Sequence, residues 1–340
     1  MILRSSRNHA GVKPWLKRPA RASVQAMMEA RPLLEDSPLP LVVEGDGATG
    51  PADLADWAVS NRQQIDAWLQ QSGGLLLRRF SLKDADDFRT VAEAVRPELK
   101  AYVGGDSPRR RIAQGVYSST EFPPHLEIGL HNELSYAAWW PERLMFFCQQ
   151  PAARGGATHI ADGRRVLAAL DPAVRQRFAD KGVRYHQHLR DRDGPPGPGK
   201  SWQETFETED QKAVEAQAGA MEITWSERGL STAIDRPGVI AHPVTGERVW
   251  FNQADQWHAQ LGGMENWNAP PDDPEPHHHA RYGDGGEIPL ADLEAVRAAY
   301  RASEVSFAWQ AGDLLLLDNL LVLHGRKPFQ GPRRVLVAMA

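Results

Sequence analysis

The chain has 340 residues and only one cysteine, Cys148. A single cysteine excludes a disulfide within the chain and agrees with a reducing compartment, so we expect a cytoplasmic protein. Cys148 lies in an apolar stretch, which predicts a buried, inert thiol rather than a nucleophile. No apolar run approaches the roughly 18 residues of a membrane-spanning helix, and the N-terminal positive charges precede no apolar signal segment. We therefore expect no membrane partner.

Basic residues are not in excess either. The sequence holds 39 Lys and Arg against 44 Asp and Glu, which gives a formal net charge of -5. This balance argues against a surface for nucleic acid or anionic lipid. The hydrophobic fraction of 41% and the charged fraction of 24% are typical of a globular protein. Because barrels of this length often form one domain, we expect one domain over residues 51–340 after an N-terminal arm, residues 1–50, with little regular structure.

The most informative segment runs from Leu130 to Tyr136 and contains His131 and Glu133. Residues two apart on a strand point to the same face, so both side chains can reach one metal ion. With a distant second histidine they would form the 2-His-1-carboxylate triad of non-haem Fe(II) oxygenases, which leaves coordination positions open. His-X-Glu also occurs by chance, and the alternative is an ordinary histidine beside an ordinary glutamate.

The C-terminal segment supplies the second histidine. Two apolar runs, residues 314–317 and 320–323, flank Asp318 and Asn319, and His324 closes the second run. These runs predict adjacent buried strands. Arg333 and Arg334 follow a Pro/Gly turn and begin another strand. A fixed guanidinium there can pair with a carboxylate, as a dicarboxylic cosubstrate on the metal would require.

Hydrophobic periodicity outlines the remaining elements. We expect helices over residues 52–70, 81–95 (with Ser81 at its start), 162–180 (broken at Asp171-Pro172) and 291–302. We expect strands over residues 75–77, 144–148, 157–161 and 183–188, a hairpin over 239–252, and a strand-rich segment over 305–337. Residues 263–286, which include three consecutive histidines, are expected to form a loop. The predicted fold is mainly β within the α+β class: a double-stranded β-helix, or jelly roll, with helical insertions.

Several stretches together resemble a known family. They are residues 116–124, 130–136, 141–148, 155–162 and 318–334. The chain resembles the TauD/TfdA (clavaminate synthase-like) superfamily of Fe(II)/2-oxoglutarate-dependent dioxygenases, and within it the SyrP-like group, which modifies amino acids for peptide natural products. The resemblance implies Fe(II), 2-oxoglutarate as cosubstrate, and O2.

The resemblance also assigns roles to residues. It implies His131, Glu133 and His324 as the catalytic iron ligands. It implies that Thr158 hydrogen-bonds 2-oxoglutarate and that Arg334 pairs with its far carboxylate, with Arg333 as the neighbouring candidate. Strand alternation sends the two arginines to opposite faces, so only one should face the site. The arginine that binds the sulfonate in taurine dioxygenase would fall near Ala338, which argues against a sulfonate substrate.

The resemblance bears on the reaction as well. Related iron halogenases replace the carboxylate ligand by Ala or Gly, whereas Glu133 is present here. We therefore expect hydroxylation of an unactivated C–H bond in an amino acid, free or bound to a peptidyl carrier protein, in antibiotic or other natural-product biosynthesis. Desaturation or oxidative cyclisation of another small molecule or peptide is the alternative. A non-catalytic jelly-roll binding module is the alternative outside the enzymes.

Candidate substrate contacts are less specific. Glu127 either binds a substrate ammonium or is a surface carboxylate. Gln114 and Ser119 precede the metal-binding segment and are candidates for the pocket wall, and Arg326 either closes a salt bridge under the site or contacts substrate. Asp318 and Asn319 either orient His324 or only make hydrogen bonds within a turn.

Overall fold

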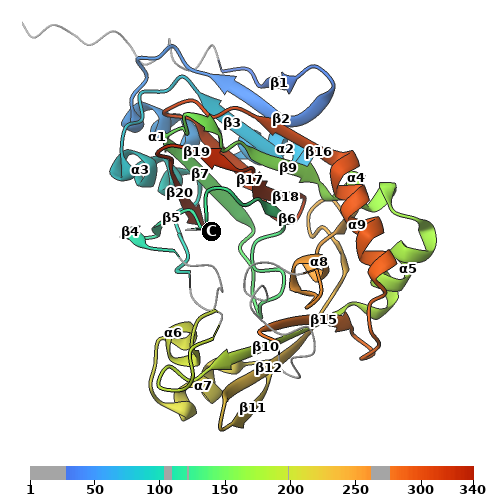
Figure 1. Cartoon of the computed structure of the whole chain (residues 1–340). Coiled ribbons are helices and arrows are strands. Elements are labelled where there is room, and N and C mark those ends of the chain that lie inside the picture. The colour runs from blue at the N-terminus through green and yellow to red at the C-terminus, as the bar shows by residue number, and fades with distance from the viewer. Residues whose placement is uncertain (1–27, 103–108, 121, 198, 262–275) are drawn as a thin grey trace, which may run out of the picture.

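The computed structural model describes residues 28–340 except 103–108, 121, 198 and 262–275. A sheet of eight strands forms one side of the molecule (Figure 1). Its strands, in spatial order, are β1 (Arg31–Leu34), β2 (Ser37–Glu44), β3 (Gly74–Arg78), β17 (Leu314–Asp318), β7 (Arg143–Gln150), β20 (Arg334–Met339), β5 (Val116–Ser118) and β4 (Arg111–Ala113). Among the described strands, β2 and β3 are the one parallel pair, and α1 with α2 forms the crossover that a parallel pair needs.

A sheet of four strands lies beside the larger one. Its order is β16 (Glu304–Phe307), β9 (Thr158–Asp162), β18 (Val322–Arg326) and β6 (Ile128–His131). A second four-stranded sheet, at the bottom of Figure 1, contains β11 (Glu222–Ser226), β12 (Gly229–Arg236), β10 (Val183–Arg190) and β15 (His278–Tyr282). Two short ribbons complete the described strands: β13 (Val239–Ala241) with β14 (Arg248–Trp250), and β8 (Arg154–Gly155) with β19 (Phe329–Gln330).

Helices cover the outer faces of the sheets. The first three are α1 (Pro51–Ser60), α2 (Arg62–Ser72) and α3 (Ala85–Val95), and they pack on the eight-stranded sheet. On the other side, α4 (Gly163–Ala169), α5 (Pro172–Lys181), α8 (Ala254–Trp257) and α9 (Leu290–Ser303) contribute to one cluster with β9, β18 and β10. The short helices α6 (Trp202–Phe206) and α7 (Gln211–Ala218) pack near β10 to β12. The chain is therefore a mixed α/β structure.

The leucine run of β17 shows how the layers are joined. Leu314 and Leu316 belong to the cluster under α1 to α3. Leu315 and Leu317 belong to the cluster that joins the eight-stranded sheet to the four-stranded sheet of β16, β9, β18 and β6; we call these the two main sheets. Side chains alternate along a strand, so a strand that is buried on both faces is apolar at every position. The same alternation on β7 and β20 places Phe146 and Val335 between the sheets. The space between the sheets is thus filled from both sides.

The structure corrects three expectations. Residues 31–44, which we expected in an irregular arm, form β1 and β2 of the large sheet, while residues 1–27 lie outside the described part. The helix expected from Ser81 begins at residue 85, because the Asp84 carboxylate accepts hydrogen bonds from the backbone of Asp86 and Asp87. The apolar runs around Asp318-Asn319 are not adjacent strands: β17 and β18 belong to different sheets.

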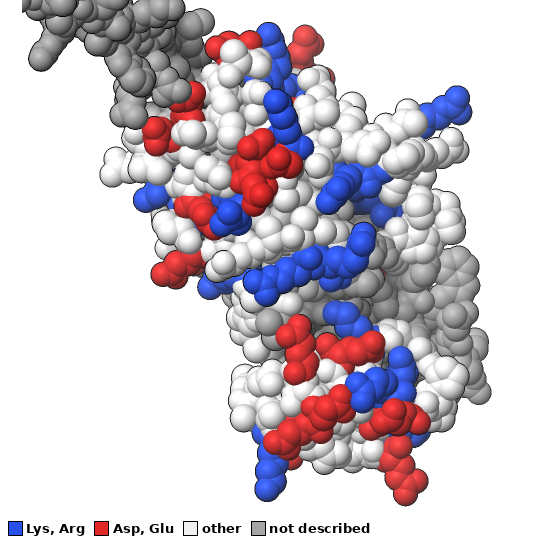
Figure 2. Space-filling model, turned by 90° about the vertical axis from the view of Figure 1, so that its left-hand side faces the viewer, with Lys and Arg blue, Asp and Glu red and all other residues white. Residues whose placement is uncertain are grey.

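Most other expected elements are present. The helical region 162–180 breaks before Pro172, and residues 239–250 form the expected hairpin. The stretch 263–286 was expected to be a loop, but its residues 278–282 are β15, while residues 262–275 lie outside the described part. No helix among the described residues is both long enough and apolar enough to cross a membrane. Figure 2 shows acidic and basic side chains interspersed over one face, with a short row of basic side chains across its middle.

Candidate metal centre

His131 and His324 face each other across a strand pair. They are register partners at the end of β6 and in β18, and their ring centroids are 4.3 Å apart. Gly325 permits this close approach, since a Cβ at that position would lie 2.4 Å from the carbonyl oxygen of Ile128 on β6. The strand pairing therefore brings together two imidazoles that are almost 200 residues apart in the sequence.

Glu133 lies in the turn directly after β6, and its backbone is held from the opposite side of the site. The Asn319 side chain accepts a hydrogen bond from the Glu133 N–H at 2.8 Å and donates to its carbonyl oxygen at 3.0 Å. It also donates to the Pro141 carbonyl oxygen at 2.8 Å. Asn319 therefore positions the carboxylate residue, and the described contacts of its side chain do not include His324.

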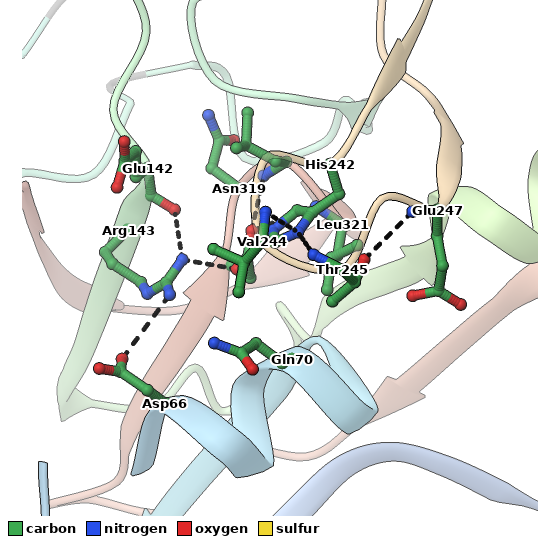
Figure 3. Close-up of polar contacts among 12 residues, drawn as sticks. Asp66, Gln70, Glu142, Arg143, His242, Val244, Thr245, Glu247, Asn319 and Leu321 are labelled. Carbon is green, nitrogen blue, oxygen red and sulfur yellow. Dashed lines mark hydrogen bonds and ion pairs between the residues drawn. The ribbon is translucent and has the colours of Figure 1, made fainter. Parts of the chain in front are cut away.

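Asp318, the residue before Asn319, is fixed by a buried charge network (Figure 3). Its carboxylate accepts from Arg143 at 2.5 Å and from His242 at 3.3 Å, and its other oxygen accepts from the backbone N–H of Leu320 at 3.0 Å. These bonds hold the turn in which the chain crosses from the large sheet to the smaller one. Asp318 thus makes the turn bonds that we considered for it and also anchors Asn319.

The three side chains converge on one point. The candidate ligand atoms of His131, Glu133 and His324 all lie within 4.8 Å of one another, and His324 Nε2 is 3.5 Å from Glu133 Oε2. His131 Nδ1 lies 2.9 Å from the Gly129 carbonyl oxygen, so it must carry the proton, which leaves the Nε2 lone pair free. Two imidazoles with one carboxylate are a donor set that fits Fe(II) with positions left open.

Burial and charge set the protonation of this cluster. Desolvation, followed by the nearby His324, lowers the pKa of His131 to about 3. Desolvation likewise lowers the pKa of His324, although Glu133 opposes it. Burial alone would raise the pKa of Glu133, but Arg109 and then His324 outweigh it, so the pKa falls well below its usual range. At neutral pH the cluster is therefore two neutral imidazoles and one carboxylate, the forms that bind a metal ion.

Arg109 is a site residue that the sequence analysis missed. Its Nη2 atom donates to both carboxylate oxygens of Glu133, at 2.9 and 2.8 Å, and its side chain is only 3% exposed. Its guanidinium lies over the Tyr102 ring, 4.5 Å from the centroid. The only sequence signal was a run of three arginines, residues 109–111, before a short strand. Nothing in that run shows which arginine turns inward.

A small cavity of about 40 Å³ lies between the eight-stranded sheet and the sheet that contains β6 and β18, beside His131 and His324. Thr158 and Arg333, both of them candidates for 2-oxoglutarate binding from the sequence, line this cavity. The Thr158 hydroxyl accepts from the Trp309 indole N–H at 3.0 Å, so its own proton is free for a ligand oxygen. Arg333 donates to the Gly156 carbonyl oxygen at 3.1 Å, and burial together with Arg326 lowers its pKa to about 10.

The preference for Arg334 over Arg333 is not supported by the geometry. Arg334 is exposed and begins β20, whereas Arg333 lines the small cavity. Arg333 and Val335 both line the small cavity, so strand alternation turns Arg334 to the opposite face. Gln114 is also misplaced, because it is exposed in the turn between β4 and β5 and lines neither cavity described here. Ser119 does line the small cavity.

Arg326 lines the small cavity as well, but its contacts are structural. It donates to the carbonyl oxygens of Phe122, Pro123 and Leu126 at 2.7 to 2.9 Å. It thereby holds the segment that leads into β6. The expected salt bridge under the site is not among these contacts.

A larger cavity of about 570 Å³ lies on the other side of the metal cluster. His131 and Glu133 line it together with aromatic side chains such as Tyr136 and Trp257. Glu127 lies on its wall at 45% side-chain exposure and pairs with Lys327 at 3.0 Å. The Glu127 carboxylate thus already has a cationic partner. This cavity is large enough for a small organic molecule.

Comparisons with known proteins identify the family of the chain. The model of the "Taurine catabolism dioxygenase TauD, TfdA family" matches residues 35–339. Curated relatives include the dapdiamide synthesis protein DdaC of Enterobacter agglomerans, 36% identical over 91% of this chain and 93% of that protein. A clavaminate synthase-like protein of Arabidopsis thaliana is 30% identical over 90% of this chain and 94% of the relative. The chain belongs to the TauD/TfdA family.

Solved structures share the fold. PvcB from Pseudomonas aeruginosa has a TM-score of 0.54 at 16% identity and covers 97% of this chain and 94% of its own. It is described as an Fe, alpha-ketoglutarate dependent oxygenase from an isonitrile synthetic pathway. AAD-2, solved with Mn(II) and N-oxalylglycine, has a TM-score of 0.54 at 13% identity, with coverage of 92% and 96%.

The protein is therefore a 2-oxoglutarate-dependent non-haem iron dioxygenase, with Fe(II), 2-oxoglutarate and O2 as its cofactors and cosubstrates. This result decides against a non-catalytic binding module. The superfamily predicted from the motifs is confirmed.

Proposed function

We propose that this dioxygenase hydroxylates an unactivated C–H bond of an amino-acid-like small molecule in natural-product biosynthesis, with His131, Glu133 and His324 as its iron ligands. The observation that carries the proposal is the convergence of these three side chains, with their ligand atoms within 4.8 Å of one another. The relationship to DdaC, a protein of dapdiamide synthesis, supports a natural-product amino acid as substrate. In this proposal the eight-stranded sheet and the sheet of β16, β9, β18 and β6, which share one apolar cluster, form the double-stranded β-helix.

We further propose that 2-oxoglutarate extends from the proposed iron site into the small cavity, which holds its far carboxylate. Thr158 donates its hydroxyl proton to the ligand, and Arg333 rather than Arg334 pairs with the far carboxylate. When bound, iron with 2-oxoglutarate and O2 supplies the oxidising power that breaks the C–H bond. The residues of the chain supply placement: Gly129 fixes the tautomer of His131, and Asn319 fixes the backbone of Glu133.

The larger cavity is the proposed substrate site. It borders His131 and Glu133, and its wall combines aromatic side chains with the charged residues Glu127, Glu304 and Lys327. Such a wall suits a small molecule that carries both polar and apolar groups. A substrate held there with one C–H bond directed at the metal reacts at that bond and not at others.

Hydroxylation is preferred because Glu133 occupies the carboxylate position, which leaves no site for a halide in its place. Desaturation and oxidative cyclisation start with the same hydrogen abstraction and are the alternative outcomes. A substrate on a peptidyl carrier protein and a free amino acid both remain candidates.

The test measures succinate and oxidised product after the anaerobic iron-loaded protein is mixed with 2-oxoglutarate, candidate substrate and air. Free amino acids and the same amino acids as carrier-protein thioesters form the panel. We expect substrate-stimulated succinate formation and a product heavier by one oxygen atom. We expect the Glu133→Ala variant to fold and to lose this product, because one of three metal ligands is gone. Full turnover by that variant would refute the ligand assignment.

A further inference from the structure

The small cavity is lined by three cationic side chains, and of these Arg109 already pairs with Glu133. Arg109, Arg326 and Arg333 are all on its wall, and no acidic side chain is among its described lining residues. Burial lowers the pKa of Arg326, and burial followed by the charge of Arg326 lowers the pKa of Arg333. Three guanidiniums around a space this small repel one another unless an anion lies between them. The cavity is therefore built for a ligand with more than one negative charge.

The three arginines have different environments. Arg326 donates hydrogen bonds to three backbone carbonyl oxygens. Arg333 donates to one backbone carbonyl oxygen, that of Gly156. Arg333 and Arg326 both lie near the Phe329 ring, with guanidinium carbons 5.6 and 5.0 Å from its centroid. Arg109 contacts Glu133 and therefore lies at the metal end of the cavity. The cavity thus has one cation, Arg109, at the triad and two more, Arg326 and Arg333, near Phe329.

Arg109 also has donors left over. Its Nε and Nη1 atoms have no hydrogen-bond partner among the described residues, and the side chain is only 3% exposed. Buried donors of a charged group without acceptors are costly, so their presence indicates a missing acceptor. Glu133 cannot supply it, because both of its oxygens already face Nη2 and one of them is needed by the metal in the proposed site.

We propose that Arg109 binds the carboxylate at the metal end of 2-oxoglutarate, while Arg333 binds the carboxylate at the far end. This assignment rests on the proposed location of 2-oxoglutarate in the small cavity. Arg109 would then bridge Glu133 and the cosubstrate, which fixes both groups relative to the iron. In this role Arg109 is a positioning residue, and it reaches the site from the segment before β4 rather than from β20.

The test separates the two ends of the ligand. Binding of 2-oxoglutarate and of 2-oxobutyrate, which lacks the second carboxylate, is measured by calorimetry on protein saturated with Mn(II) under anaerobic conditions. We expect Arg109→Gln to weaken both ligands by the same factor, about tenfold to a hundredfold, since each loses one charge-assisted interaction. We expect Arg333→Gln to weaken 2-oxoglutarate and leave 2-oxobutyrate unchanged. Arg111→Gln, at an exposed position of β4, is the matched control and should alter neither.

The outcomes distinguish the proposals. If Arg109→Gln leaves both affinities unchanged, or weakens only 2-oxoglutarate, the role of Arg109 is refuted. If Arg334→Gln rather than Arg333→Gln removes the preference for the dicarboxylate, the far-end assignment fails while that of Arg109 stands. Should Arg109→Gln not fold, Arg109→Lys keeps the charge without the planar fork. It should weaken both ligands equally but less, and unchanged binding would again refute the role.

Discussion

Asn319 has a larger effect on the site than its place in a turn suggests. Its amide side chain makes three buried hydrogen bonds: with the N–H of Glu133, with the carbonyl oxygen of Glu133 and with the carbonyl oxygen of Pro141. An amide can do this because it is both donor and acceptor, whereas a carboxylate offers only acceptors. The position of Glu133, the proposed acidic metal ligand, therefore depends on the Asn319 side chain.

We expect Asn319→Ala to destabilise the metal-free protein by about 2–4 kcal/mol, because buried N–H and C=O groups lose their partners. We also expect at least a tenfold loss in Mn(II) affinity, since the Glu133 backbone is no longer held. Urea denaturation and calorimetric Mn(II) titration measure the two effects. Asn61→Ala is the control, because Asn61 bonds Trp57 at the end of α1, away from the site. Wild-type Mn(II) affinity in Asn319→Ala would contradict this role.

At the scale of elements, the site depends on how closely β18 and β6 approach. Gly325 follows His324 on β18, and a Cβ there would lie 2.1 Å from the His159 ring and 2.4 Å from the Ile128 carbonyl oxygen. The Ile128 carbonyl oxygen is a backbone atom and cannot rotate away as a side chain could. The glycine thus permits a strand spacing that sets the distance between His131 and His324, the two proposed histidine ligands.

We expect Gly325→Ala to push β6 away from β18 and separate His131 from His324. The predicted result is a loss of about 1–3 kcal/mol in stability from overpacking and a Mn(II) affinity reduced at least tenfold. Gly50→Ala, where a Cβ meets nothing within 4 Å, should change neither quantity appreciably. Thermal unfolding and Mn(II) titration of both variants are the measurements. Equal metal affinity in both would show that the spacing is not critical.

At the scale of the whole molecule, buried histidines make stability depend on pH. His258, at the end of α8, is buried, and this burial followed by the nearby His279 lowers its pKa to about 4. In the unfolded chain a histidine titrates near 6.5, so between about pH 6.5 and 4 the unfolded state binds more protons than the folded state. Stability therefore rises with pH across this window and is lost as the pH falls through it.

We expect the free energy of unfolding to fall by up to about 1.4 kcal/mol per pH unit for each such histidine below pH 6.5. His258→Asn should reduce the slope by its own share, whereas His125→Asn, at an exposed position, should leave it unchanged. Urea denaturation of the metal-free proteins at pH 7, 6 and 5 measures the slopes. An unaltered slope in His258→Asn would mean that its burial does not suppress its protonation.

Much of the fold followed from local patterns. The alternation and apolar runs of β7, β9 and β17 predicted buried strands, and the Asp171-Pro172 break in the helical region appears where expected. The prediction of an irregular arm was wrong for residues 31–44, because β2 pairs with β3 and β1 pairs with β2, and neither long-range pairing can be read from local sequence. The third sheet, with β10, β12 and β15, likewise depends on long-range pairing.

From the sequence alone we could predict the types of donor: two histidines and a glutamate for iron, and a hydroxyl and an arginine for the cosubstrate. This was possible because ligand chemistry depends on side-chain type, which is printed in the sequence. Only the tertiary structure decided that Arg333 faces the cavity instead of Arg334, that Arg109 contacts Glu133, and that Asn319 holds Glu133. Alternation fixes which neighbours share a face, but the packing of distant segments decides which face meets the site.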